Sequence, residues 1–112
     1  MIKPDDPREL VLALLARSPC HVQVAAVLAD RDGCFAWGWN SAGDGFGEHA
    51  EAACIRRANK RRLHAATLYV AARRRKSMNI VTARPCAGCA WTVRGVGEVV
   101  YRDGEGVWHK YS

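Results

Sequence analysis

The sequence predicts an α/β fold with three layers (α/β/α), in which a five-stranded mixed sheet is flanked by helices. Helical and strand-like patterns follow one another in the order α, β, β, α, β, α, β, β, which favours a single sheet covered by helices. The chain has 112 residues, of which 49% are hydrophobic and 25% are charged. This length suffices for one hydrophobic core and is too short for two. We therefore expect a single domain that spans residues 1–112.

The first helix is indicated by its start signals. Asp6 is a candidate N-cap, Pro7 occupies the first helical position, and Glu9 follows the cap by three residues. Apolar residues at helical spacing continue through residues 10–15, and Pro19 ends the segment. The sequence therefore predicts that a helix precedes the first strand.

Five strands are expected. Residues 21–29 and 34–40 are rich in β-forming residues and are separated by DRDG, which predicts a hairpin. Residues 65–73 predict a third strand, and two more strand-like runs lie on either side of residues 103–106. Parallel neighbours need a crossover of about a dozen residues or more, which four turn residues cannot supply. The last two strands are therefore antiparallel if they pair.

Two further helices are expected. A glycine-rich loop leads into a helix predicted over residues 49–63. A brief helix begins after Pro85, which suits a first helical turn, and ends at the glycines Gly95 and Gly97. Both helices begin close to side chains that bind metal ions.

The charge is strongly basic and concentrated in two clusters: a first of Arg56, Arg57, Lys60, Arg61 and Arg62, and a second of Arg73, Arg74, Arg75 and Lys76. Seventeen Lys and Arg against eleven Asp and Glu give a net charge of +6, so polyanions are plausible partners. The first cluster is equally well explained as a solvated helix face, whereas the second adjoins the loop before the cysteine motif. The candidate nucleic-acid contacts are Arg57 and Arg61 from the first cluster and Arg73, Arg74, Arg75 and Lys76 from the second.

The sequence predicts a soluble protein that is cytoplasmic or otherwise intracellular and does not enter a membrane. No apolar run approaches the roughly 20 residues of a membrane span, and the N-terminus lacks the basic start of a signal peptide. The five cysteines are an odd number without the spacing of a disulfide scaffold. Free thiols or metal ligation are therefore expected.

A metal site is predicted from residues far apart in the chain. Cys86 and Cys89 are three residues apart, so both sulfurs fall on nearly the same face of a helical turn and can bind one metal ion. His49, at the start of the other helix, is the natural third ligand, which leaves a fourth position open to water, as in catalytic zinc sites. Glu51 can then act as the proton-transferring group. Residues two apart diverge by about 200° on a helix, so His49 and Glu51 share a site only if the helix begins at His49.

The segments HAE (49–51) and PCAGC (85–89) resemble the H-x-E…P-C-x-x-C signature of the zinc-dependent cytidine deaminase superfamily. WGWN (37–40) and TLYV (67–70) resemble strand segments of nucleotide and tRNA deaminases. The resemblance implies a cytidine deaminase-like fold, Zn²⁺ as the cofactor, and hydrolytic deamination of cytosine to uracil. It also implies these roles: His49, Cys86 and Cys89 bind zinc, Glu51 moves protons, Asn40 contacts the substrate sugar, and the backbone at Ala50 and Cys86 contacts the base.

Other aromatic and basic residues are candidates for contact with the substrate. Phe46 lies in the glycine-rich loop and is the best candidate for an exposed stacking residue, and Arg84 directly precedes the Pro-Cys motif. Trp39 is expected in the core with Trp37 and Trp91, with a possible second role beside a flipped base. Cys20, Cys34 and Cys54 are interpreted as small core residues, and a structural zinc site with Cys54 as fourth ligand is the alternative to a catalytic one.

Two features separate this chain from many members of the superfamily. Residues 72–83 (ARRRKSMNIVTA) intervene between the third strand and the cysteine motif, and no helix separates the last two strands. The second feature resembles the branch that includes free cytidine deaminases and toxin-type nucleic-acid deaminases. Because the chain is small and basic, we expect cytosine in single-stranded or opened nucleic acid as the substrate, DNA ahead of RNA. The alternatives are a free cytidine or deoxycytidylate deaminase and a non-catalytic zinc module that binds nucleic acid.

Overall fold

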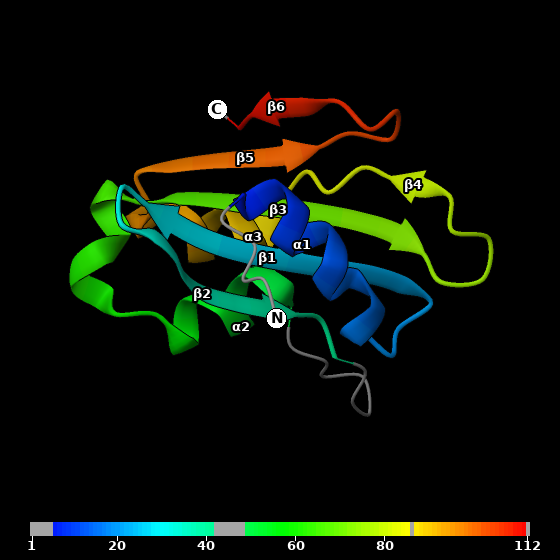
Figure 1. Ribbon diagram of the computed structural model, residues 1–112, viewed down its shortest axis with the longest axis horizontal. Coiled ribbons are helices and arrows are strands. Elements are labelled where there is room, and N and C mark those ends of the chain that lie inside the picture. Colours follow the sequence, from blue (N-terminus) through cyan, green and yellow to red (C-terminus); the bar gives the residue numbers. More distant parts are fainter. Residues whose placement is uncertain (1–5, 42–48, 86, 112) are drawn as a thin grey trace.

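The computed structural model describes residues 6–41, 49–85 and 87–111 and contains one mixed sheet of six strands. The strand order is β2-β1-β3-β5-β6, with β4 paired to β3 (Figure 1). The five predicted strands are present, and a sixth, β4, was not predicted. The strands are β1 (Val22–Asp30), β2 (Gly33–Trp39), β3 (Thr67–Arg74), β4 (Ile80–Val81), β5 (Glu98–Arg102) and β6 (Trp108–Lys110).

The sheet combines antiparallel and parallel pairing. β1 pairs antiparallel with both β2 and β3, and β3 pairs parallel with β5. The parallel pair is joined by a crossover through α3 (Ala87–Thr92) and the 3₁₀ turn η3 (Val93–Gly95). β5 and β6 pair antiparallel, with Val100 opposite Lys110, which confirms the predicted geometry of the last two strands.

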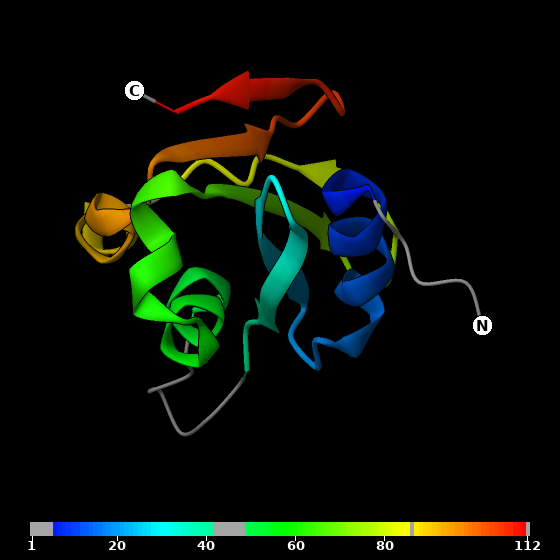
Figure 2. The ribbon, with the colours of Figure 1, turned by 60° about the vertical axis from the view of Figure 1, so that its left-hand side comes forward.

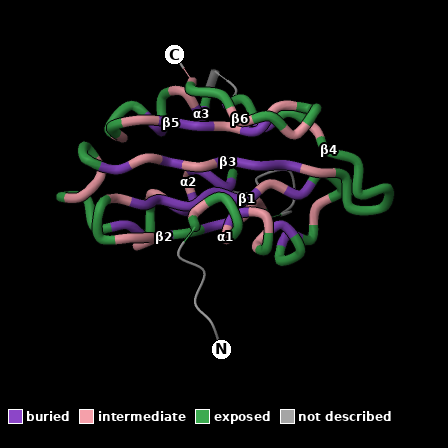
Figure 3. The backbone as a smooth tube through the Cα atoms, turned by 45° about the horizontal axis from the view of Figure 1, so that its top comes forward, coloured by how far each residue is buried: buried purple, intermediate pink, exposed green. Residues whose placement is uncertain are grey.

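Helices cover both faces of the sheet, as the three-layer prediction requires. Figure 2 shows α1 (Pro7–Leu14) and the short turn η1 (Leu15–Arg17) on one face, and α2 (Ala50–Arg57), η2 (Lys60–Ala65) and α3 on the other. Each face has its own hydrophobic core, and the central strands are the most deeply buried part of the chain (Figure 3). The two faces are called here the α1 side and the α2 side.

The α1 helix begins as the sequence predicts. Asp6 has extended backbone geometry, its carboxylate accepts a hydrogen bond of 2.9 Å from the Arg8 amide, and Pro7 starts the helix. Val11 and Leu15 are fully buried against the sheet. The cap satisfies an amide that would otherwise lack a partner in the first turn.

The prediction that α2 continues to residue 63 is wrong. The helix ends at Arg57, Ala58 is extended, and the chain continues as the separate 3₁₀ segment η2. Asn59 explains the break, because its side chain accepts a hydrogen bond of 3.0 Å from the Arg61 amide and so begins a new turn. The Lys60 ammonium donates to the carbonyls of Ile55 and Ala58 at the end of α2.

The unpredicted strand β4 lies within the intervening stretch of residues 72–83. It has only two residues, Ile80 and Val81, which pair with Arg73 and Ala72 of β3. Met78 adopts a positive φ of 63° in the connecting turn. The stretch therefore folds back along the edge of β3 that faces away from β1, and the Ala83 amide donates a hydrogen bond to the Arg102 carbonyl of β5.

A close approach between α2 and β2 fixes the height of α2 above the sheet. A side chain at Gly38 would bring a Cβ atom within 2.6 Å of the Cys54 backbone nitrogen, so only glycine fits there. Cys54 is fully buried, as predicted, whereas Cys20 and Cys34 are only half-buried. The prediction that Trp37 and Trp91 belong to the core is wrong, because their exposed fractions are 40% and 71%.

Candidate active site

The start of α2 sets the positions of His49 and Glu51. His49 is the N-cap residue with extended backbone geometry (φ −71°, ψ 151°), and Ala50 is the first helical residue. The His49 carbonyl accepts a hydrogen bond of 3.0 Å from the Ala53 amide. Because the turn of the helix starts only after His49, the His49 and Glu51 side chains both line one cavity. The helix therefore begins with His49 as its N-cap, as is required for His49 and Glu51 to share one site.

His49 and Cys89 lie close enough to bind one metal ion. The His49 Nδ1 atom is 2.9 Å from the Cys89 Sγ atom, which belongs to the buried side of α3. Two such ligands on one tetrahedral zinc would lie about 3.5 Å apart, given Zn–N and Zn–S bonds of about 2.0–2.1 and 2.3 Å. A small outward shift of either side chain would accommodate the ion. The residues present therefore fit zinc.

The third predicted ligand, Cys86, lies outside the described residues. Within residues 6–41, 49–85 and 87–111, no group of three or more His, Cys, Asp or Glu side chains converges as a metal site. The alternative with Cys54 as a ligand is disfavoured, since burial raises the pKa of its thiol to about 12 and zinc binds the thiolate. The ligand set His49, Cys86 and Cys89 stays a prediction.

The cavity next to His49 has a volume of about 180 Å³. Glu51 is 5% exposed and contributes a carboxylate to a wall that is otherwise largely apolar. Such a carboxylate, within reach of a bound molecule and shielded from bulk water, is suited to proton transfer. The lining residues are Val22 and Val24 of β1, Ala72 of β3, Thr82, Ala83 and Arg84 after β4, His49, Glu51 and Cys89.

Most of the cavity wall was not predicted from the sequence. Val22, Val24 and Ala72 belong to no motif, and they meet because β1 and β3 pair antiparallel with Val24 opposite Ala72. Thr82 and Ala83 reach the cavity through the folding back of residues 72–83. The only signal for them in the sequence was the unusual length of that stretch.

The predicted substrate contacts divide into two groups. Ala50 is buried at the start of α2, and Arg84 lines the cavity, with its guanidinium 5.5 Å from the centre of the Tyr111 ring. Asn40 and Trp39 do not line the cavity, and Phe46 lies outside the described residues. Asn40 Oδ1 accepts hydrogen bonds from the Val24 amide and the Ser18 hydroxyl, and its Nδ2 donates to the Val22 carbonyl. Asn40 thus fixes the backbone of Val22 and Val24, which both line the cavity.

Trp39 is half-buried and lies between two cations. The guanidinium of Arg17 is 6.0 Å from the centre of its ring, and that of Arg57 is 5.4 Å away. Arg57 Nη1 also donates to the Trp37 carbonyl, at 3.4 Å. The Trp39 ring is therefore in contact with cationic side chains of the protein itself.

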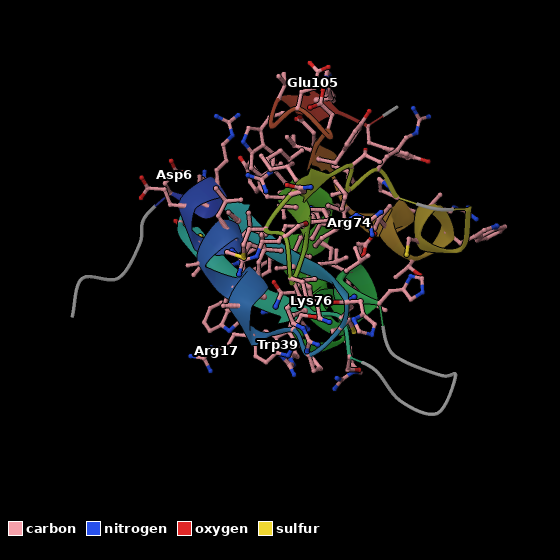
Figure 4. The ribbon with its side chains drawn as sticks, turned by 90° about the vertical axis from the view of Figure 1, so that its right-hand side faces the viewer. Asp6, Arg17, Trp39, Arg74, Lys76 and Glu105 are labelled. Carbon is pink, nitrogen blue, oxygen red and sulfur yellow. The ribbon has the colours of Figure 1, made fainter. Side chains whose placement is uncertain are left out.

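The cations at the end of β3 alternate between two environments. Arg73 donates to the Gln23 side chain at 2.8 Å, and Arg75 donates to the Pro19 carbonyl at 3.0 Å. Arg74 and Lys76 are exposed and, among the described residues, form no side-chain hydrogen bond or ion pair. In Figure 4, which looks onto this end of the sheet, they lie between α1 and α3.

Arg74 and Lys76 belong to the side of the sheet that carries the cavity. Arg74 is paired with Val22, which lines the cavity, and Arg74 and Lys76 border a neighbouring surface hollow of about 280 Å³. His21 and Ser77 complete the described lining of that hollow. The cavity and the hollow therefore adjoin at the first residues of β1.

Arg61 belongs to a different surface. It is exposed and borders a hollow of about 460 Å³ with Asp30, Arg31 and Asp32, at the far end of β1. The carboxylates in this hollow make it mixed in charge rather than basic.

Comparison with known sequences identifies the family. Residues 8–102 match the family described as the cytidine and deoxycytidylate deaminase zinc-binding region. The chain belongs to this family. Its cofactor is therefore zinc, as predicted, and its class is that of the zinc-dependent cytidine or cytosine deaminases.

Solved structures support the fold of this family member. A cytidine deaminase from Burkholderia pseudomallei is similar, with a TM-score of 0.72 and 21% sequence identity over 93% of this chain and 87% of that chain. At this identity the likeness concerns the fold alone. A search of curated proteins gives no significant match. No helix in the described part of the chain has the length and apolar character needed to cross a membrane.

Proposed function

We propose that the protein deaminates cytosine to uracil within single-stranded or locally opened nucleic acid, DNA ahead of RNA. The observation that carries the choice of substrate is the position of Arg74 and Lys76, two exposed cations beside the cavity that have no partner among the described residues. A polyanionic backbone is the natural ligand for cations in this arrangement.

The chemistry at the base follows from the residues of the cavity. His49, Cys89 and the predicted ligand Cys86 would hold zinc, which as a Lewis acid makes a bound water a nucleophile near neutral pH. Glu51 accepts a proton from the attacking water and delivers it to N3 of the ring. Glu51 then moves a second proton from the new hydroxyl group on C4 to the amine nitrogen, so that ammonia departs and uracil remains.

The size of the cavity fits a base better than a whole nucleotide. Its volume of about 180 Å³ lies below the roughly 300–1,000 Å³ that is usual for pockets enclosing drug-sized ligands. A flipped base can enter while its sugar and phosphates stay at the mouth. Arg84 lies at that mouth, and Arg74 and Lys76 are within the adjoining hollow, where phosphates on either side of the target would pass.

A free cytidine or deoxycytidylate deaminase is the second candidate. It is favoured by the similar structure, whose title describes a cytidine deaminase. A single nucleotide phosphate would also suit Arg74 or Lys76. A non-catalytic zinc module is the third reading, and it requires that Glu51 move no proton.

The test is a panel of cytidine, dCMP, single-stranded DNA, single-stranded RNA and duplex DNA, incubated with zinc-loaded protein and analysed for uracil. We expect uracil chiefly in single-stranded DNA. Product from cytidine or dCMP alone would overturn the proposed substrate and favour the second candidate. Zinc-loaded protein that binds the oligonucleotides and yields no product from any substrate would favour the third.

A further inference from the structure

Arg102, at the end of β5, is a buried charge without a counter-ion among the described residues. Its exposed fraction is 9%, and its Nε atom is fully shielded from solvent with no hydrogen-bond partner. The described ion pairs, Arg62 with Asp30 and His109 with Asp103, do not include it. Buried guanidinium groups are normally paired, because removing their water without replacing its hydrogen bonds is costly.

A second arginine lies beside it on the α1 side. β3 and β5 run parallel with Val70 opposite Tyr101, so the next step sets Arg102 beside Ala71, and Arg73 follows Ala71 on the same face. Ala71 is part of the core against α1, which establishes the face. Burial and the nearby charge of Arg73 both lower the pKa of Arg102. Two positively charged side chains, one buried and one half-buried, therefore lie close together.

The printed side-chain contacts of this pair are with neutral groups, and the nearby carboxylate of Asp103 is paired with His109. Arg73 is oriented by a hydrogen bond to the neutral amide of Gln23, which is itself buried. Trp108 of β6 pairs with Arg102, and the guanidinium of Arg8 lies 5.7 Å from the centre of the Trp108 ring. Among the described residues, the α1 side thus gathers three arginines here with no carboxylate in an ion pair with any of them.

We propose that Arg73 and Arg102 form a binding site for an oxyanion of the phosphate class, on the side of the sheet opposite the catalytic cavity. A phosphate group offers several acceptor oxygens in a tetrahedral arrangement, so it can bind both guanidinium forks at once. It would bind the terminal nitrogens of the two guanidinium groups and offset their positive charge. The phosphate comes either from free phosphate or from a phosphodiester of nucleic acid.

The site is connected to the cavity through the backbone. The Arg102 carbonyl accepts a hydrogen bond of 2.9 Å from the Ala83 amide, and Arg73 directly follows Ala72. Ala72 and Ala83 both line the cavity. An anion that fixes the two arginines on the α1 side therefore also stabilises the cavity wall on the α2 side.

Thermal unfolding of the zinc-loaded protein tests the site without any measurement of deamination. Inorganic phosphate, compared with sodium chloride at equal ionic strength, should raise the Tm of the wild type by a few degrees. Arg102→Met removes the charge and keeps the linear aliphatic stem, so it should fold and lose most of the phosphate effect. Arg31→Met, a change at an exposed arginine of the β1–β2 turn, is the matched control and should keep the effect.

Two results would overturn the site: no rise in Tm with either inorganic phosphate or a single-stranded oligonucleotide, or an equal rise in the wild type and in Arg102→Met, which would indicate an adventitious ion only. If Arg102→Met does not fold, Arg73→Met gives the same comparison from the other arginine. Protection by a single-stranded oligonucleotide but not by inorganic phosphate, lost in the variant, would identify the phosphodiester as the source. Protection by both would identify a free phosphate site. The outcome is independent of the proposed catalytic function, since an inactive protein can still show it.

Discussion

The two basic clusters precede and follow the middle of β3 in the sequence, and they differ in how many of their charges already have partners within the protein. Before the start of β3, Arg62 forms two hydrogen bonds of 2.7 Å with the Asp30 carboxylate, and Lys60 donates to carbonyls at the end of α2. At the end of β3 and in the turn after it, Arg74 and Lys76 are exposed beside the cavity. Figure 1 shows these two ends of β3 on opposite sides of the molecule. A count of charges in the sequence therefore overstates the charge that is available to a ligand.

The alternation of side chains along β3 explains why even the second cluster divides. Arg73 projects to the α1 side and is held by Gln23, whereas Arg74 lies on the α2 side with the cavity. Four consecutive cations in the sequence thus supply two different surfaces.

The largest expected effect is on the rate of deamination. It distinguishes the role of the Glu51 carboxylate in the cavity from that of the basic residues around it. Glu51→Gln should lower the rate of deamination by at least about a hundredfold, the usual scale for general acid–base catalysis. Zinc content, Tm and affinity for a single-stranded oligonucleotide should stay unchanged, because Glu51 is not a predicted ligand. Glu105→Gln, a change at an exposed turn, is the control and should keep full activity. Near-normal turnover in Glu51→Gln would show that another group moves the proton.

The next effect tests the difference between the two ends of β3 directly. Arg74→Ser combined with Lys76→Ser should weaken binding of a single-stranded oligonucleotide. The slope of log affinity against log salt should flatten by about 0.7 for each lost phosphate contact. Turnover of free cytidine, where it occurs, should be unchanged because a nucleoside has no phosphates.

Arg57→Ser combined with Arg61→Ser removes the same charge from the first basic cluster and is the matched comparison. We expect it to leave the salt slope nearly unchanged, because Arg57 is bound to Trp37 and Trp39 and Arg61 borders a hollow of mixed charge. Equal losses in the two double variants would break the distinction between the clusters. They would support a continuous basic track along the protein.

The smallest effect concerns the stability that the ion pair between Arg62 and Asp30 contributes. The hydrogen bonds from Arg62 lower the pKa of Asp30 from 3.8 to about 2, so the folded state favours the ionised carboxylate. Because the folded pKa is the lower one, the pair stabilises the protein fully above about pH 4 and loses this contribution as the pH falls towards 2. Asp30→Asn should therefore lower the urea midpoint at pH 6 by more than at pH 2.5. A difference that is the same at both pH values would contradict this role.

The elements that could be predicted from the sequence have local causes. Asp6 and Pro7 define the start of α1, and residues 103–106 are too few for anything except an antiparallel turn. The positions of His49 and Glu51 depended on where one helix begins, and the glycine-rich loop before it indicated that point. These features needed no knowledge of distant contacts.

The features that were missed depend on contacts between distant segments. The end of α2 depends on Asn59, which competes for the backbone in a run that otherwise suits a helix. β4 exists only because β3 offers an unpaired edge beyond β5, and two residues give no period to detect. Trp91 is exposed although tryptophan is usually well buried, and the Arg94 guanidinium lies 4.3 Å from its ring centre.

The central claim is that the cavity acts on a base that belongs to a nucleic-acid strand. The most direct measurement is kcat/KM for a single-stranded DNA oligonucleotide and for deoxycytidine across a series of salt concentrations, with the same zinc-loaded protein. The account predicts that the oligonucleotide is preferred and that its kcat/KM falls steeply with salt, while the value for deoxycytidine changes little. A preference for deoxycytidine, or an oligonucleotide rate that does not respond to salt, would contradict the account.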